Sequence, residues 1–82
     1  MIALKDILYK VTLNAVVGST SVNVHAVNFD SRKIKKDHLF VAIRGLVADG
    51  HDYIETAIKK GATSVVCESL PKKLDDNVTY VE

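Results

Sequence analysis

The sequence predicts a small α/β domain, and three consecutive segments carry this prediction. Residues 39–43 (LFVAI) form an unbroken apolar run, which is typical of a strand buried on both faces. Residues 51–60 repeat apolar side chains at helical spacing, and residues 63–67 form a second apolar run. A strand, a helix and a strand in this order make a βαβ unit, whose strands are parallel. We therefore expect a Rossmann-like α/β fold with a mixed sheet.

The N-terminal third predicts shorter elements. Residues 3–10 fit a short amphipathic helix, because apolar residues recur at i, i+3, i+4 and i+7. Residues 14–24 read as strand, turn and strand, with the turn at Gly18–Ser19. The apolar alternation then changes phase near Ala26–Val27, which indicates a bulge or bend before a further strand that ends at Asp30.

The helix at 51–60 has start and stop signals of its own. Asp49 or Gly50 is the expected N-cap, and Gly61 is a good residue for the position just after the helix. The apolar stripe expected to face the core consists of Tyr53, Ile54, Ala57 and Ile58. Pro71 ends the next strand region, and residues 78–82 (VTYVE) predict one last short strand.

Composition excludes several classes of partner. The 82 residues make one domain. The net charge is +1 and both signs are scattered along the chain, so the sequence shows no basic patch that would bind nucleic acid or an anionic membrane. No run is long enough to span a bilayer, and residues 1–10 do not resemble a signal peptide. The single cysteine, Cys67, is expected to be buried and inert, as in a reducing, cytoplasmic setting. The end at Glu82 looks like that of a domain cut from a longer chain.

The polar trio Asp30, Ser31 and Arg32 is the first candidate site. In one interpretation it is a turn at a strand end, where Asp30 caps local N–H groups and Arg32 pairs with a surface carboxylate. In the other it binds a ligand: Ser31 donates to a base or phosphate, and Arg32 holds an anion with two hydrogen bonds. Ligands of open α/β sheets bind at strand ends, so the residue types leave both interpretations open.

The loop 45–50 (GLVADG) lies between the strand at 39–43 and the helix, and is the second candidate site. Its backbone N–H groups suit the polar edge of a heterocycle, whereas Asp49 and Asp52 would repel a phosphate. His51 lies beside this loop. The three histidines are too far apart in sequence for a metal site, and we find no catalytic motif. From its residues alone the chain is a small binding module.

Residues 29–68 resemble the N-terminal domain of the Mur ligases, the ATP-dependent amide ligases that build the peptidoglycan stem peptide. The matching elements are DSR, LFVA, the loop and helix start G-x-x-x-DGH-x-(Y/F)-I, and the helix end A-x-x-x-GA, in this order. The resemblance implies that residues 1–82 are the domain that binds the UDP-sugar substrate. The ATP-binding domain and the C-terminal domain would lie outside this chain, which is not expected to be catalytic by itself.

The resemblance also implies a set of site residues. Phe29 and Ser31 would contact the UDP-N-acetylmuramoyl end of the substrate, together with the loop residues Leu46, Val47 and Ala48. Family members often have more polar residues in this loop, so packing and backbone contacts are expected here. Four further residues would either contact the substrate or brace the loop, namely Asp30, Arg32, Gly45 and His51.

Two branches of the family share these motifs. The short helix and strand pair before NFDSR favour the branch that adds the third stem-peptide residue, meso-diaminopimelate or lysine, to UDP-N-acetylmuramoyl-L-alanyl-D-glutamate. The alternatives are the D-alanyl-D-alanine-adding branch, a stand-alone nucleotide-sugar-binding module and a purely structural domain. The resemblance implies ATP and Mg²⁺ for the full-length ligase only, and neither a cofactor nor a metal for this chain.

Overall fold

The computed structural model describes residues 2–43 and 49–82. Its centre is a five-stranded sheet in the order β2-β7-β6-β5-β4. Four strands are parallel to one another, namely β4 (Ala26–Asn28), β5 (His38–Val41), β6 (Ser64–Val66) and β7 (Thr79–Val81). The edge strand β2 (Val16–Val17) runs antiparallel to β7. The α/β class, the mixed sheet and the βαβ unit are therefore confirmed.

The helix of the βαβ unit starts differently from the prediction of 51–60. A 3₁₀ turn, η2 (Gly50–Tyr53), comes first, and the α-helix α2 covers only Ile54–Lys59. Asp49 is the N-cap, and tight turns of this kind are frequent at helix starts. Gly61 ends α2 as predicted: its φ is +118°, and the N–H groups of Gly61 and Ala62 donate to the carbonyls of Ile58 and Ala57.

The N-terminal segment builds a second, two-stranded sheet from β1 (Ile2–Ala3) and β3 (Asn23–Val24). The helix predicted at 3–10 is shorter, α1 (Leu4–Ile7), and the left-handed backbone of Lys10 (φ 63°) marks the turn that follows it. The bend predicted near Ala26–Val27 lies one residue earlier, at His25, where the chain passes from β3 to β4. The strands predicted at 14–24 both form, but β3 pairs with β1 and β2 pairs with β7, so they are not partners of each other.

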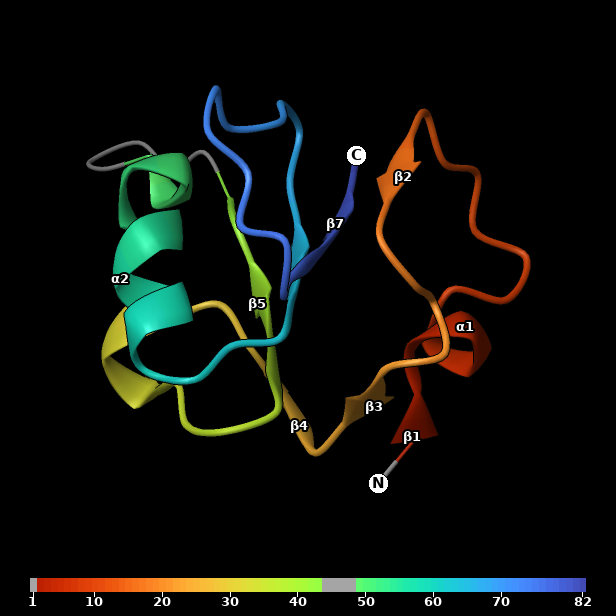
Figure 1. Cartoon of the computed structure of the whole chain (residues 1–82), viewed down its shortest axis with the longest axis horizontal. Coiled ribbons are helices and arrows are strands. Elements are labelled where there is room, and N and C mark those ends of the chain that lie inside the picture. The colour runs from red at the N-terminus through yellow and green to blue at the C-terminus, as the bar shows by residue number, and fades with distance from the viewer. Residues whose placement is uncertain (1, 44–48) are drawn as a thin grey trace.

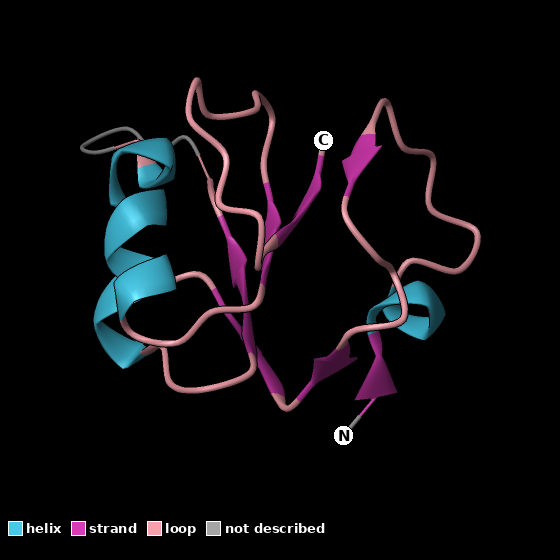
Figure 2. Ribbon diagram, viewed as in Figure 1, coloured by secondary structure: helices cyan, strands magenta, loops and turns pink. Residues whose placement is uncertain are grey.

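The two faces of the five-stranded sheet are covered by different elements, α2 on one side and the N-terminal segment with α1, β1 and β3 on the other (Figures 1 and 2). Each face carries its own apolar cluster. The α2 face contains the row Phe40, Val65 and Tyr80, which are paired across β5, β6 and β7. Ile54 and Ala57 of α2 pack on that row. On the opposite face, Leu4 of α1 and Val24 of β3 pack against Leu39, Val81 and their neighbours. Successive side chains along a strand point to opposite faces, so β5 contributes Phe40 to one cluster and Leu39 to the other.

Candidate functional site

A cavity of about 510 Å³ opens where the chain leaves β4 and β5 and enters η2. We call it the strand-end cavity. Because β4 and β5 are parallel neighbours, their carboxyl ends meet at the same edge of the sheet, which is where ligands of open α/β sheets bind. The volume lies within the usual range for small-molecule sites, roughly 300–1,000 Å³. Its lining consists of Phe29, Asp30, Ser31, Arg32, Phe40, Ile43, Gly50 and Tyr53.

The predicted polar trio forms a capped turn on one wall of this cavity. Asn28 accepts a hydrogen bond from the Asp30 N–H (3.1 Å), and Asp30 Oδ1 accepts one from the Arg32 N–H (3.0 Å). This second bond caps the short 3₁₀ helix η1 (Ser31–Lys33). Ser31 lies within the turn and is only 7% exposed. The turn thus fixes the backbone of Ser31, which the sequence predicted as a site residue.

Arg32 pairs with the carboxylate of its own turn. Its Nε and Nη2 atoms donate to Asp30 Oδ1 and Oδ2 over 3.0 and 2.9 Å. These hydrogen bonds hold the pKa of Asp30 at about 2 and raise the pKa of Arg32. The Arg32 side chain is 84% exposed, and only two of the five guanidinium donors go to Asp30. Of the two interpretations left open by the sequence, the geometry matches the surface ion pair, and it leaves donors for an anion.

The other walls of the strand-end cavity are apolar. Phe29 is 72% exposed, Ile43 51% and Tyr53 44%, while Phe40 is buried. The sequence predicted Phe29 as a site residue, and it lines the cavity together with Ser31. Ile43 was not predicted as a site residue. The prediction that Tyr53 belongs to the core-facing stripe of the helix was wrong. The 3₁₀ turn that precedes α2 places Tyr53 off that stripe, and no periodicity signal distinguishes the two cases.

The Gly50 N–H donates to the Ile43 carbonyl over 2.7 Å. The His51 N–H donates to Asp49 Oδ1 (2.9 Å) and the Asp52 N–H to the Asp49 carbonyl (3.1 Å). These backbone donors are therefore used within the protein. The predicted site residues Gly45, Leu46, Val47 and Ala48 lie outside the described residues.

His51 links the start of η2 to the segment after β6. Its Nδ1 lies 2.6 Å from Asp49 Oδ1, and its Nε2 lies 3.0 Å from the Glu68 nitrogen and 3.4 Å from the Ser69 nitrogen. Two N–H groups point at Nε2, so Nε2 is the acceptor and the protonated Nδ1 donates a hydrogen bond to Asp49 Oδ1. His51 thus connects Asp49 to residues 68–69, and its role towards a substrate stays a prediction.

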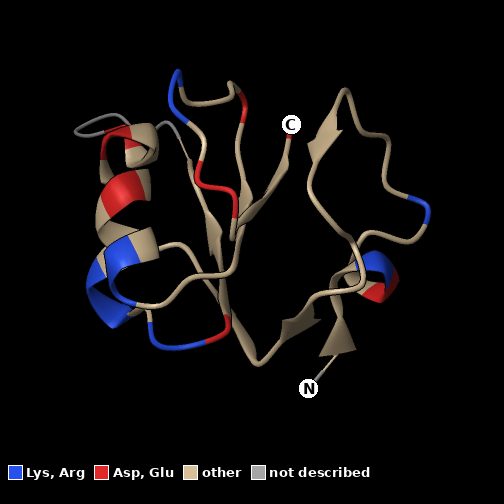
Figure 3. Ribbon diagram, viewed as in Figure 1, with Lys and Arg blue, Asp and Glu red and all other residues tan. Residues whose placement is uncertain are grey.

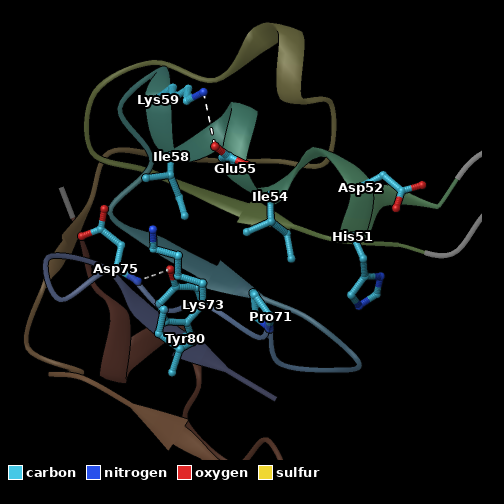
Figure 4. A pocket seen from close by; sticks show the side chains of 11 residues that line it. His51, Asp52, Ile54, Glu55, Ile58, Lys59, Pro71, Lys73, Asp75 and Tyr80 are labelled. Carbon is cyan, nitrogen blue, oxygen red and sulfur yellow. Dashed lines mark hydrogen bonds and ion pairs between the residues drawn. The ribbon is translucent and has the colours of Figure 1, made fainter.

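His51 also lines another cavity, of about 500 Å³, between α2 and the segment 71–75 (Figure 4). Ile54, Ile58 and Pro71 give it an apolar side, and the Tyr80 hydroxyl accepts a hydrogen bond from the Asp75 N–H at 2.9 Å. Lys59 pairs with Glu55 over 3.3 Å on the same helix. Of the predicted site residues that the structure describes, only His51 lines this cavity.

The chain's residues do not fit the ATP and Mg²⁺ implied for the full-length ligase. The sequence contains no G-x-x-x-x-G-K-[ST] loop to cradle phosphates. Within residues 2–43 and 49–82, no group of three His, Cys, Asp or Glu side chains could hold a metal ion. In the same described part of the chain, no helix is long and apolar enough to cross a membrane.

Comparison with known proteins identifies relatives that share most of this chain. A family model described as "Mur ligase family, catalytic domain" matches residues 23–80. The UDP-N-acetylmuramoyl-L-alanyl-D-glutamate–2,6-diaminopimelate ligase of Phocaeicola vulgatus is 47% identical over 79 residues, which cover 96% of this chain and 16% of that ligase. The ligase of the same name from Cytophaga hutchinsonii is 54% identical over 69 residues, covering 84% of this chain and 14% of that ligase.

Two solved structures share the fold of this chain. MurF ligase from Thermotoga maritima, solved in complex with ADP, aligns with a TM-score of 0.58 and 27% identity over 67% of this chain and 12% of its own. MurF from Acinetobacter baumannii shares the fold at a TM-score of 0.60 and 19% identity, over 71% of this chain and 12% of its own. The chain thus spans less than a fifth of the length of each of these relatives. From the family match over residues 23–80 and these identities, the chain belongs to the Mur ligase family.

Proposed function

We propose that this chain binds the uridine-diphosphate end of UDP-N-acetylmuramoyl-L-alanyl-D-glutamate. It would do so within a cytoplasmic ligase that adds 2,6-diaminopimelate in an ATP-dependent step of peptidoglycan synthesis. The observation that carries the proposal is the strand-end cavity, which brings Phe29 and Ser31 to the carboxyl edge of the sheet. The names of the relatives from Phocaeicola vulgatus and Cytophaga hutchinsonii support the choice of substrate and of the added residue.

Among the described residues, Arg32 is the cation that lines the strand-end cavity, and the guanidinium donors that do not bind Asp30 suit a phosphate. Arg32 and Lys33 of η1 lie beside Lys59 and Lys60 at the end of α2, where Figure 3 shows basic residues of both elements at one corner. Lys60 Nζ donates to the Arg32 carbonyl over 3.3 Å, which joins the two elements. Cations on exposed side chains attract an anion without the cost of desolvating a buried charge.

The domain's contribution to the reaction is positioning. Holding the nucleotide end of a long substrate orients the distant carboxylate that reacts elsewhere in the ligase, and such orientation lowers the entropy cost of the reaction. ATP and Mg²⁺ supply carboxylate activation in that other part of the ligase. Phe29, Ser31, Leu46, Val47 and Ala48 are the residues that we assign to the nucleotide-sugar.

The D-alanyl-D-alanine-adding ligase is a second candidate, because the solved structures reported above are MurF proteins. The sequence relatives favour the first candidate, since they are 47% and 54% identical to this chain and the MurF structures only 27% and 19%. A stand-alone nucleotide-sugar-binding module is the third candidate. The gene sequence beyond Glu82 distinguishes it from a ligase. A ligase requires a phosphate-binding G-x-x-G-K-[ST]-type loop there.

The test is an amide-ligase assay of the full-length protein with two substrate pairs. We expect product from UDP-N-acetylmuramoyl-L-alanyl-D-glutamate with diaminopimelate, and none from the tripeptide precursor with D-alanyl-D-alanine. Calorimetric titration with UDP and ADP should show binding of UDP to this domain, which is weak when the domain is isolated. A full-length protein that binds neither UDP nor the UDP-linked dipeptide would contradict the proposal and favour a structural domain.

A further inference from the structure

Three large apolar side chains stand exposed around one cavity. Phe29, Ile43 and Tyr53 all line the strand-end cavity, although they come from the end of β4, the end of β5 and η2. Single exposed apolar residues are common on proteins, but a cluster in one concavity marks a surface that receives a partner or ligand. The grouping of these three side chains therefore needs an explanation beyond chance exposure.

Tyr53 is not explained by core packing. It belongs to neither of the two core clusters, whereas the next residue, Ile54, is 5% exposed and lies in the α2-face core. Gly50 lines the same cavity without a side chain, and a Cβ atom there would come within 2.6 Å of the Ile43 nitrogen. The cavity wall at η2 is thus formed by a bare backbone position and an exposed aromatic ring.

Tyr53 also lies close to the polar wall. Asp30 raises the pKa of Arg32 most, through their hydrogen bonds, and the Tyr53 phenol adds a smaller effect in the same direction. Tyr53 and Arg32 both line the strand-end cavity. This arrangement sets an apolar ring face beside a group that can hold an anion, which matches a nucleobase followed by a phosphate.

We propose that the ring of Tyr53 stacks on the pyrimidine base of the UDP end, with Phe29 as the second aromatic contact in the strand-end cavity. The inference rests on the proposed function and deepens it by naming a base-recognition residue. Aromatic rings hold bases by stacking, which depends on the ring and not on the phenol hydroxyl. A phenylalanine at this position should therefore bind as well as the tyrosine.

The test compares three variants of the full-length ligase, Tyr53→Leu, Tyr53→Phe and Tyr9→Leu. Tyr9 is the matched control, because it is 75% exposed and follows α1 on the opposite side of the sheet. We expect Tyr53→Leu to raise the KM for the UDP-linked dipeptide roughly five- to thirtyfold, with kcat little changed. Tyr53→Phe and Tyr9→Leu should retain the wild-type KM.

A spectroscopic readout accompanies the kinetics. When UMP binds the full-length protein, the H5 and H6 protons of uracil should shift upfield through the ring current of Tyr53, and Tyr53→Leu should reduce that shift. Thermal unfolding of each variant checks its folding. If Tyr53→Leu fails to fold, the proton shifts with wild type and Tyr53→Phe decide, and the absence of an upfield shift in both overturns the inference.

The failures of the two proposals are distinguishable. If wild type binds UMP and the UDP-linked dipeptide, but Tyr53→Leu matches Tyr9→Leu in KM and in proton shifts, the stacking role of Tyr53 is wrong and the proposed function stands. If wild type binds neither ligand, the proposed function is wrong and the inference falls with it.

Discussion

The imidazole of His51 accepts a hydrogen bond from the backbone N–H of Glu68 at 3.0 Å, and so joins segments 17 residues apart. One segment follows β5 and leads into η2, and the other follows β6. Asp49 fixes the other side of the ring through its contact with Nδ1. The start of η2 is therefore tied to the end of the neighbouring strand β6 by a single side chain.

The first prediction concerns this brace. His51→Ala removes the acceptor of the Glu68 N–H and the partner of Asp49, so the free energy of unfolding should fall by about 1–2 kcal/mol. Urea denaturation of the chain measures this change. His25→Ala is the matched control, because His25 is exposed and its only described ring contact is with His38 at 6.1 Å. If the two variants have the same free energy of unfolding, His51 does not stabilise the fold.

The second prediction concerns the carboxylate of Asp30, whose pKa of about 2 lies below the ordinary 3.8. The ionised form is favoured in the folded state, so its contribution to stability is present above pH 3.8 and disappears as the pH falls towards 2. A titration followed by carbon-13 NMR should give a pKa of about 2. Arg32→Ala should move this pKa back towards 3.8, whereas Lys33→Ala should leave most of the shift in place, since the hydrogen bonds of Arg32 dominate.

The third prediction concerns Ser31 in the full-length ligase. If Ser31 contacts the nucleotide-sugar, Ser31→Ala should raise the KM for the UDP-linked dipeptide roughly three- to tenfold, the worth of about one hydrogen bond. Ser69→Ala is a suitable control, because Ser69 is exposed and does not line the strand-end cavity. A KM that stays at the wild-type value in Ser31→Ala would remove Ser31 from the site.

The fourth prediction concerns the end of α2. Gly61 has φ +118°, and a Cβ atom there would lie 2.8 Å from the Lys36 Cα atom. Gly61→Ala should therefore lower the free energy of unfolding by about 1–3 kcal/mol, through backbone strain and this contact. Thr56→Ala in the same helix, at an exposed position, should change it by less than about 0.5 kcal/mol. Thermal or urea unfolding compares the two variants directly.

The fifth prediction concerns Cys67. Burial, and then the charge of Glu82, raise the pKa of its thiol, and the side chain is only 5% exposed. Ellman's reagent should therefore react with Cys67 only after unfolding in denaturant. A cysteine introduced by Ser69→Cys, two residues further and exposed, should react at once in the native protein. Fast native labelling of Cys67 itself would contradict its buried position.

The sequence alone determined the features whose causes are local. The apolar runs predicted β5 and β6, and the left-handed position of Gly61 ended α2 as expected. The spacing of DSR, LFVA and DGH predicted the family, and it brought attention to Phe29 and Ser31, which share one cavity. Caps, periodicity and turn residues act over a few positions, so they can be read along the chain.

Only the tertiary structure decided the features that depend on distant partners. Val16 and Val17 pair with Val81 and Tyr80 at the far end of the chain, and no local pattern distinguishes this from a hairpin with β3. Tyr53 is exposed because the helix begins with a 3₁₀ turn instead of an α-helical one. His51 contacts Glu68 because β5 and β6 are neighbours in the sheet. Such contacts form because the folded chain brings together strand edges and ends that the sequence keeps apart.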